Sequence, residues 1–233
     1  MCKRILLLNS KGGCGKTTLA TNLAAYYAAH DMPTTIIDYD TQSSSIQWLK
    51  QRPEQLQGIT GIEAHQVKTG VTRSWALRVP EHTQRVIIDT PAGFSRLDLL
   101  VQARKANLIL VPVLPSPIDI RAFGHFVKTL YFDPVVRQKA RIGVVANRVR
   151  HGTLVFNALE HFLKQINIPF VATLRDSQLY IKAANLGIGI HEYPAQNKTK
   201  IMQDWQTLIH WLENDYPDEQ EPDLHLPVKT LSL

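Results

Sequence analysis

The stretch NSKGGCGKTT, residues 9–18, lies between an apolar run that is typical of a buried strand and an alanine-rich pattern that is typical of a helix. A phosphate-binding loop needs this context, because its glycines let the backbone approach the phosphates and the helix N-terminus adds a partial positive charge. Lys16 is then placed to reach the β- and γ-phosphates, Thr17 to ligate Mg²⁺ through its hydroxyl, and Thr18 to contact the α-phosphate. The stretch therefore predicts a P-loop that binds a nucleotide together with Mg²⁺.

Strand-like and helical patterns alternate along the rest of the chain. Strands are predicted at residues 4–9, 34–38, 62–67, 85–89, 107–113, 141–147 and 169–173. Helices are predicted at residues 16–30, 43–51, 95–105, 118–131, 153–166, 177–186 and 198–214. Several of the strand runs are continuously apolar, as strands buried on both faces are. The alternation predicts an α/β fold with a mainly parallel, doubly wound sheet and helices on both of its faces.

Length and composition limit the classes of protein that fit. A chain of 233 residues suits one α/β domain with a single core. No apolar run approaches the roughly 20 residues that a membrane-spanning helix needs, so no stable membrane insertion is expected. Cys2 and Cys14 are the only cysteines, so we expect no disulfide framework and a reducing cytoplasm.

Charge is unevenly distributed along the sequence. Residues 1–212 carry 25 Lys and Arg against 14 Asp and Glu, whereas residues 213–233 carry one Lys against six acids. A body this basic favours polyanions such as DNA or an anionic membrane surface, although a generic basic surface fits the charge equally well. We predict one P-loop domain over residues 1–214 and an acidic, proline-containing, mobile tail over residues 215–233.

The front of the loop departs from the general pattern G-x-x-x-x-G-K-[ST], because Ser10 stands where that pattern demands glycine. The loop reads K-G-G-x-G-K-T-T instead, and in this it resembles the deviant P-loop ATPases that include ParA and MinD. In that family the early lysine reaches the partner subunit's ATP. The resemblance therefore implies that Lys11 makes ATP binding and formation of a homodimer interdependent. Without the resemblance, Lys11 would be interpreted as a solvated loop lysine.

Two further segments extend the resemblance to the switch regions of the family. IIDYDTQ, residues 36–42, is similar to switch I, D-x-D-P-Q, with Thr41 in place of the proline. The similarity implies that Asp40 positions the attacking water and that Asp38 supports the metal shell; the alternative is that both merely cap the next helix. VIIDTPAG, residues 86–93, is similar to switch II. Its Asp89, a charge at the carboxyl end of an apolar strand, is suited to hold the hydration shell of Mg²⁺.

The base is predicted from a segment late in the chain. A guanine site of the common kind needs N-K-x-D, and the nearest stretch is NRVR, residues 147–150, with arginine in place of the carboxylate. ATP is therefore favoured over GTP. Asn147 is a candidate for the adenine edge, although the amide of a turn at a strand end is an equally good interpretation.

The motifs together give the following candidate residues. Nucleotide-binding residues are Lys11, Gly12, Gly13, Cys14, Gly15, Lys16, Thr17, Thr18 and Asn147. Metal-site residues are Thr17, Asp38 and Asp89, and catalytic residues are Lys11, Lys16 and Asp40. Cys14 occupies the variable position of the loop; a low-pKa thiol beside Lys16 is a second, weaker hypothesis.

Three functions are compatible with these nucleotide-binding motifs. The first is a ParA-like, nucleoid-associated ATPase whose ATP dimer binds DNA without sequence preference. Its slow hydrolysis, stimulated by an adaptor or centromere-binding protein, would time the partition or positioning of DNA or a large cargo. Phosphate contacts of this kind are steeply salt-dependent. Candidate DNA-binding residues are Arg148, Arg150, Lys164, Arg175, Lys182, Lys198 and Lys200.

The two alternatives have less support in the sequence. A MinD-like membrane switch needs a carboxyl-terminal amphipathic helix with lysines on its polar face, whereas residues 223–233 contain a proline and a single lysine. The other alternative is a metabolic enzyme of the same fold. An iron–sulfur reductase would need a pair of mid-chain cysteines, which this sequence lacks, whereas a ligase-type synthase would need a small-substrate pocket, which a sequence does not reveal.

Overall fold

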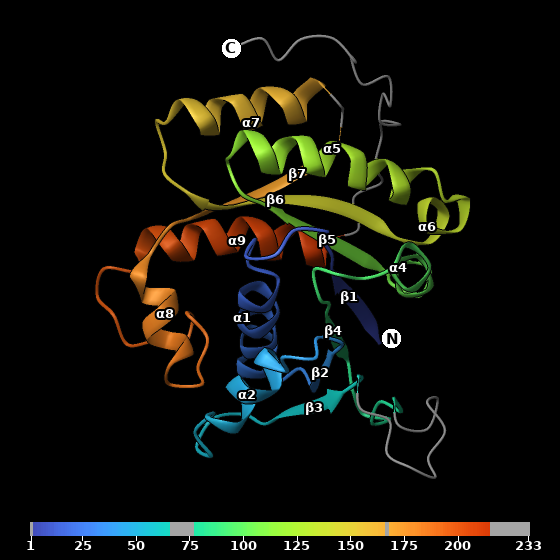
Figure 1. Cartoon of the computed structure of the whole chain (residues 1–233). Coiled ribbons are helices and arrows are strands. Elements are labelled where there is room, and N and C mark those ends of the chain that lie inside the picture. Colours follow the sequence, from blue (N-terminus) through green and yellow to red (C-terminus); the bar gives the residue numbers. More distant parts are fainter. Residues whose placement is uncertain (1, 66–76, 166–167, 215–233) are drawn as a thin grey trace.

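The computed structural model of the chain describes residues 2–65, 77–165 and 168–214, and within them all strands run parallel in one sheet (Figure 1). The strands are β1 (Lys3–Leu7), β2 (Thr34–Asp38), β3 (Ile59–Glu63), β4 (Arg85–Asp89), β5 (Leu108–Val113), β6 (Arg141–Val149) and β7 (Phe170–Arg175). Their order in the sheet is β3-β2-β4-β1-β5-β6-β7, so the strand that carries the P-loop lies at the centre. The predicted α/β class with a doubly wound parallel sheet is confirmed.

Helices cover both faces of the sheet (Figure 1). They are α1 (Lys16–Ala29), α2 (Ser44–Lys50), α4 (Arg96–Ala103), α5 (Pro117–Tyr131), α6 (Pro134–Lys139), α7 (Leu154–Gln165), α8 (Gln178–Ala184) and α9 (Thr199–Glu213). Alternate residues of a strand point to opposite faces, so β1 supplies Leu6 to the core beneath α5 and α7, and Ile5 and Leu7 to the core beneath α1 and α9. Burial on both faces explains the continuously apolar strand sequences.

Two elements differ from the sequence-based prediction. The third strand runs from Ile59 to Glu63 rather than over residues 62–67, of which residues 66 and 67 lie outside the described part of the chain. Helix α6 was not predicted, although its start has a clear signal. Asp133 accepts hydrogen bonds from the backbone of Val135 and Val136, and Pro134 occupies the first helical position.

Two other predictions concern the tail and membrane-spanning helices. The predicted mobile tail, residues 215–233, lies outside the described residues. Among the residues that are described, no helix has both the length and the apolar character required to cross a bilayer.

The register of the sheet brings two carboxylates together. Asp38 ends β2 and Asp89 ends β4, and the two residues are direct partners across these adjacent strands. Leu7, the last residue of β1, is in turn the partner of Asp89. Because β1 leads directly into the P-loop, the carboxyl edge of the sheet assembles the candidate loop and both acidic residues at one place.

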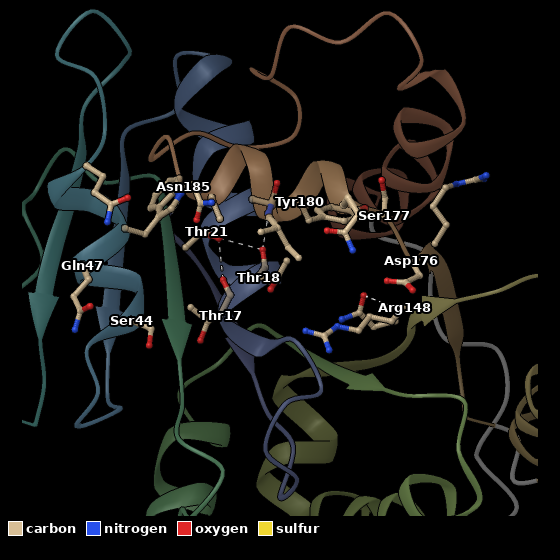
Figure 2. Close-up of a pocket in the computed structure, with 18 residues that line it drawn as sticks. Thr17, Thr18, Thr21, Ser44, Gln47, Arg148, Asp176, Ser177, Tyr180 and Asn185 are labelled. Atoms are coloured by element: carbon tan, nitrogen blue, oxygen red, sulfur yellow. Dashed lines mark hydrogen bonds between the residues drawn. The ribbon is translucent and has the colours of Figure 1, made fainter.

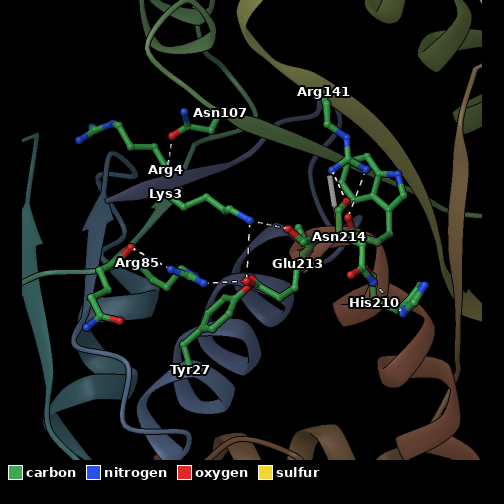
Figure 3. Close-up of polar contacts among 12 residues, drawn as sticks. Lys3, Arg4, Tyr27, Arg85, Asn107, Arg141, His210, Glu213 and Asn214 are labelled. Carbon is green, nitrogen blue, oxygen red and sulfur yellow. Dashed lines mark hydrogen bonds and ion pairs between the residues drawn. The ribbon is translucent and has the colours of Figure 1, made fainter. Parts of the chain in front are cut away.

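The last turn of α9 covers the amino-terminal ends of β1 and β4, at the edge of the sheet opposite the P-loop (Figure 3). Glu213 accepts hydrogen bonds from the hydroxyl of Tyr27 at 2.7 Å and from the guanidinium of Arg85 at 2.6 Å. Lys3 lies 3.7 Å from the same carboxylate and donates to the carbonyl of Leu212. Burial acts to raise the pKa of Glu213, but the Tyr27 and Arg85 hydrogen bonds outweigh it and lower the pKa below its usual value. One carboxylate thus joins the ends of α1 and α9 to the beginnings of β1 and β4.

We predict that Glu213→Ala lowers the free energy of unfolding by about 2–3 kcal/mol, because charge-assisted hydrogen bonds are lost and Arg85 keeps its charge without its carboxylate partner. Urea denaturation followed by circular dichroism measures the change. Gln206→Ala, at an exposed position of the same helix, is the matched control and should shift stability by less than about 0.5 kcal/mol. Equal unfolding curves for parent and Glu213→Ala would contradict the assigned role.

Candidate nucleotide and metal site

The P-loop has the backbone conformation that its glycines allow. Gly13 and Gly15 both have positive φ, 73° and 96°, in the region that side chains disfavour. The ammonium of Lys16 lies within the loop, where it donates to the carbonyls of Asn9 at 3.2 Å and Lys11 at 3.0 Å. The Lys16 ammonium is thus bonded to backbone carbonyls of its own loop.

Cys14 is an interior residue of the loop. Its thiol is fully buried and donates to the carbonyl of Lys11 at 3.3 Å. Burial raises the pKa of the thiol, against the lowering effect of the nearby Lys16 ammonium. The hypothesis of a low-pKa thiol is therefore wrong, because desolvation outweighs the neighbouring positive charge. The side chain of Cys14 therefore belongs to the core beneath the loop.

Lys11 combines a fixed backbone with a free side chain. Its N–H donates to the side chain of Asn9 at 3.0 Å, and its carbonyl accepts from Lys16. Its ammonium forms no hydrogen bond or ion pair with any residue in the described part of the chain. Lys11 is only partly buried. The loop therefore presents an unpaired cation from a well-defined position beside the P-loop.

Switch I is organised by the Asp38 carboxylate. One of its oxygens accepts from the backbone N–H of Asp40 at 2.9 Å. The other accepts from both the hydroxyl, at 2.6 Å, and the N–H, at 3.1 Å, of Ser45. Asp38 therefore caps the first turn of α2 and shapes the segment that carries Asp40, which is the structural alternative considered from the sequence. One oxygen of Asp40 accepts from the N–H of Gln42 at 2.9 Å.

Asp89 is the buried group whose bonding is incomplete. It is 1% exposed, and neither carboxylate oxygen has a hydrogen-bond partner. Burial and then the neighbouring charge of Asp38 raise the pKa of Asp89 to about 7, while the Thr17 hydroxyl and the Lys16 ammonium act in the opposite direction. A buried carboxylate without a partner is costly, so this position needs a donor or a cation that the described residues do not supply.

The residues present fit Mg²⁺ held at the end of β4. Mg²⁺ prefers oxygen ligands and keeps several waters, and it is commonly bound by one or two carboxylates together with substrate phosphates. Asp89 has free oxygens, and the Thr17 hydroxyl is near enough to affect its pKa. The described residues contain no group of three or more His, Cys, Asp and Glu side chains that would form an all-protein metal site. The metal would therefore be shared with a polyphosphate.

A cavity of about 510 Å³ lies next to the loop, along the first two turns of α1 (Figure 2). Thr17 and Thr18 face it from the first turn of α1, and Arg148 faces it from the end of β6. The other walls are α2, with Ser44, Gln47, Trp48 and Gln51, and the segment from Arg175 to Asn185. The volume and polar lining suit a nucleoside next to the phosphate loop.

The α8–α9 connection, which follows the far wall of this cavity, packs against the end of α2. Arg52, which follows α2, forms a bidentate pair with Glu192 at 2.6 and 3.0 Å, and both side chains are less than 10% exposed. Gly187 lies so close to the backbone of Gln51 that a Cβ on it would approach to 2.4 Å. The α8–α9 connection and the helix after switch I are therefore one packed unit.

Asn147 lies at the end of the cavity nearest the loop. Its amide nitrogen donates to the carbonyl of Cys14 at 2.8 Å, and its oxygen accepts from the N–H of Arg148 at 3.0 Å. The interpretation as a strand-end amide therefore accounts for the contacts seen. Arg148 has φ 52°, and the register of β6 with β7 shifts at this point, so the backbone is strained where Arg148 enters the cavity wall.

The structure does not gather the seven predicted DNA-binding residues into one surface. Arg148 and Arg175 line the cavity, and Arg175 is held by Asp204 at 2.6 and 2.8 Å. Arg150 pairs with Asp176, and Lys198 donates to two backbone carbonyls. Lys164, Lys182 and Lys200 are exposed and have no side-chain partner in the described part of the chain, and the same holds for the guanidinium of Arg148. Lys164 lies on α7, in the helical layer opposite to α8 and α9.

The sequence matches the model of the CobQ/CobB/MinD/ParA nucleotide binding domain over residues 5–190. Because this match spans most of the chain, the protein belongs to that family of P-loop nucleotide-binding proteins, which includes the ParA and MinD ATPases, and the predicted family is confirmed.

Individual relatives share lower identity. The Maintenance of carboxysome distribution protein A of Halothiobacillus neapolitanus is 23% identical over 199 residues, which covers 84% of this chain and 89% of that protein. The protein of the same name from Gloeobacter kilaueensis is 27% identical over 215 residues, covering 91% and 94%. The MinD cell division protein of Aquifex aeolicus has the same fold, with a TM-score of 0.68 at 15% identity over 93% of this chain and 99% of that one.

We predict that Asp89→Asn makes the ligand-free protein more stable than the parent at pH 8. The folded pKa of about 7 lies above the ordinary value of 3.8, so the folded state keeps this proton longer than the unfolded state. The contribution of Asp89 to stability therefore falls as pH rises from about 4 to 7, by at most about 4 kcal/mol. Thermal unfolding without Mg²⁺ should show a higher Tm for the variant at pH 8 and nearly equal values at pH 4.

Glu54→Gln, at an exposed position, is the control for loss of a carboxylate and should follow the parent at every pH. The same Asp89→Asn protein should lose the rise in Tm that Mg-ATP gives the parent. A variant whose Tm follows the parent from pH 4 to pH 8 would show that Asp89 carries no burial cost.

Proposed function

We propose that the protein is a ParA-like ATPase in which binding of Mg-ATP joins two subunits, and in which slow hydrolysis of ATP separates them again. The observation that carries this proposal is Lys11, whose backbone is fixed by Asn9 and Lys16 while its ammonium has no partner among the described residues. A lone cation beside a phosphate loop has a natural counter-ion in a triphosphate. A triphosphate in the subunit's own loop is served by Lys16, so Lys11 is available to the ATP of a second subunit.

Each polar group of the site has a distinct task in this cycle. Lys16 exchanges the carbonyls of Asn9 and Lys11 for phosphate oxygens, and the N–H groups of the loop bind the same anion. Asp40 has one oxygen bonded to the N–H of Gln42, and its second oxygen would orient the attacking water. Thr17 and Asp89 would hold Mg²⁺, which would supply neutralisation of charge on the phosphates. Transfer of a phosphoryl group to water depends mainly on such positioning and neutralisation, and Asp38 contributes by holding the switch I backbone.

The ATP dimer is proposed to bind DNA without sequence preference and to position a large cellular cargo on the nucleoid. The charge of residues 1–212 supports a polyanionic partner. Lys182 and Lys200 are exposed and unpaired within the described residues, and they extend from the same helical layer of the sheet. Two curated relatives are carboxysome distribution proteins, which supports a positioning role. A partner protein would stimulate the hydrolysis that releases the cargo.

We predict that Lys11→Ala retains ATP binding but remains monomeric with saturating ATP, with dimerisation weakened by roughly thirtyfold or more, because an unpaired phosphate charge would be buried between subunits. Light scattering with ATP and with ADP measures the association. Lys105→Ala removes an exposed lysine from another surface and should dimerise like the parent. Lys16→Ala should lose nucleotide binding altogether. An ATP dimer of parental affinity in Lys11→Ala would exclude the trans contact.

We predict that random-sequence duplex DNA retains the protein only with ATP, and that retention falls steeply between two salt concentrations, as phosphate contacts require. Asp40→Ala, which binds ATP but does not hydrolyse it, should stay on DNA longer than the parent. Lys182→Ala combined with Lys200→Ala should weaken DNA binding and lower its salt dependence, whereas Lys105→Ala should do neither. Equal retention with ATP, with ADP and without nucleotide would show that DNA binds only to a basic surface and that ATP does not control the binding.

A further inference from the structure

The amide of Asn147 is built into the wall of the P-loop. It is 5% exposed, and its nitrogen donates to the carbonyl of Cys14 at 2.8 Å, although the two residues are 133 positions apart in the sequence. The same nitrogen occupies the space that a side chain at Gly15 would need, because a Cβ there would approach it to 2.1 Å. The absence of a side chain at Gly15 and the amide of Asn147 are therefore complementary.

This contact fixes the orientation of one peptide group in the loop. In a trans peptide, C=O and N–H point in opposite directions across the peptide plane. When the Cys14 carbonyl is held by Asn147, the N–H of Gly15 must point away from Asn147. A carbonyl turned toward a bound phosphate would repel it, whereas an N–H attracts it, and Gly15 is also the N-cap of α1. Because Gly15 has no Cβ, its φ would tolerate either orientation of this peptide, so a contact is needed to select one.

The amide of Asn147 is itself held by its neighbour. Its oxygen accepts from the N–H of Arg148, where β6 leaves its regular pairing with β7 and Arg148 adopts φ 52°. The strained turn at the end of β6 therefore orients the amide, and the amide orients the loop. This arrangement gives the strain at Arg148 a role, since strained backbone tends to occur where a side chain must be aimed.

We propose that Asn147 is a positioning residue that acts on the triphosphate through the backbone of the P-loop, and that it does not read the adenine base. The inference rests on the proposed nucleotide binding at this loop. It implies that Asn147 contributes equally to the binding of any ligand with a triphosphate, whether or not that ligand carries a base.

The test compares ATP with inorganic tripolyphosphate, both with Mg²⁺, by isothermal titration calorimetry. Asn147→Asp keeps the shape of the side chain and the acceptor for Arg148 but cannot donate to the Cys14 carbonyl. Asn147→Ala removes both bonds. Loss of one such bond corresponds to an affinity about tenfold lower, and we expect this decrease for ATP and tripolyphosphate alike in both variants. Asn157→Ala, exposed on α7, is the control and should bind both ligands like the parent.

The rise in Tm that each ligand produces gives a second readout, which a general loss of stability would leave unchanged. Variants that lose ATP affinity but bind tripolyphosphate like the parent would show that Asn147 reads the base, and unchanged affinity for both would show that the contact has no role. Either result overturns the inference while the proposed function stands. A parent protein that binds neither ligand would overturn the proposed function itself.

Discussion

The carboxyl edge of the parallel sheet brings together negative charge that the described chain does not neutralise. The partnership of β2 and β4 sets Asp38 beside Asp89, and only Asp38 has its oxygens satisfied, by the backbone of Asp40 and by Ser45. Asp89 is buried with both oxygens free, and Lys16 is turned to the carbonyls of its own loop. Unsatisfied acceptors thus lie beside a cation that can be redirected. A polyphosphate with Mg²⁺ would satisfy the oxygens of Asp89 and the ammonium of Lys16 at once. The arrangement of the other residues of the site is best explained by that ligand.

Most of the fold could be predicted because its signals are local. Continuously apolar runs marked the inner strands, and the glycine pattern marked residues 9–18 as a phosphate loop. The prediction failed for β3, an edge strand of the sheet, where Gly61 and the exposed Thr60 give a mixed pattern instead of an apolar run. Helix α6 was missed because it is only six residues long, even though Asp133 and Pro134 mark its start.

The parts of the site that could not be predicted depend on contacts between distant residues. The bond from Asn147 to Cys14 spans 133 positions, and Arg175, a predicted DNA-binding residue, forms an ion pair with Asp204. No local pattern encodes these pairs, because they arise from the strand order. The cavity wall depends on such pairs as well. Ser45 bonds one end of α2 to Asp38, and Arg52, just past the other end, is paired with Glu192, so α2 links the segment that carries Asp40 to the α8–α9 connection.

The contacts of Glu213 also decide when the molecule can finish folding. Lys3 in the first strand bonds to the carbonyl of Leu212, 209 residues later, and Tyr27 reaches Glu213 across 186 residues. Contacts between such distant parts of a chain close slowly, because a large loop must be ordered before they form. During synthesis, Lys3 and Tyr27 therefore cannot form these bonds until α9 has been made. Until then, the edge of the sheet opposite the P-loop remains uncovered. A ribosome-bound chain that ends before α9 carries the complete phosphate loop on a sheet that still lacks its closing helix.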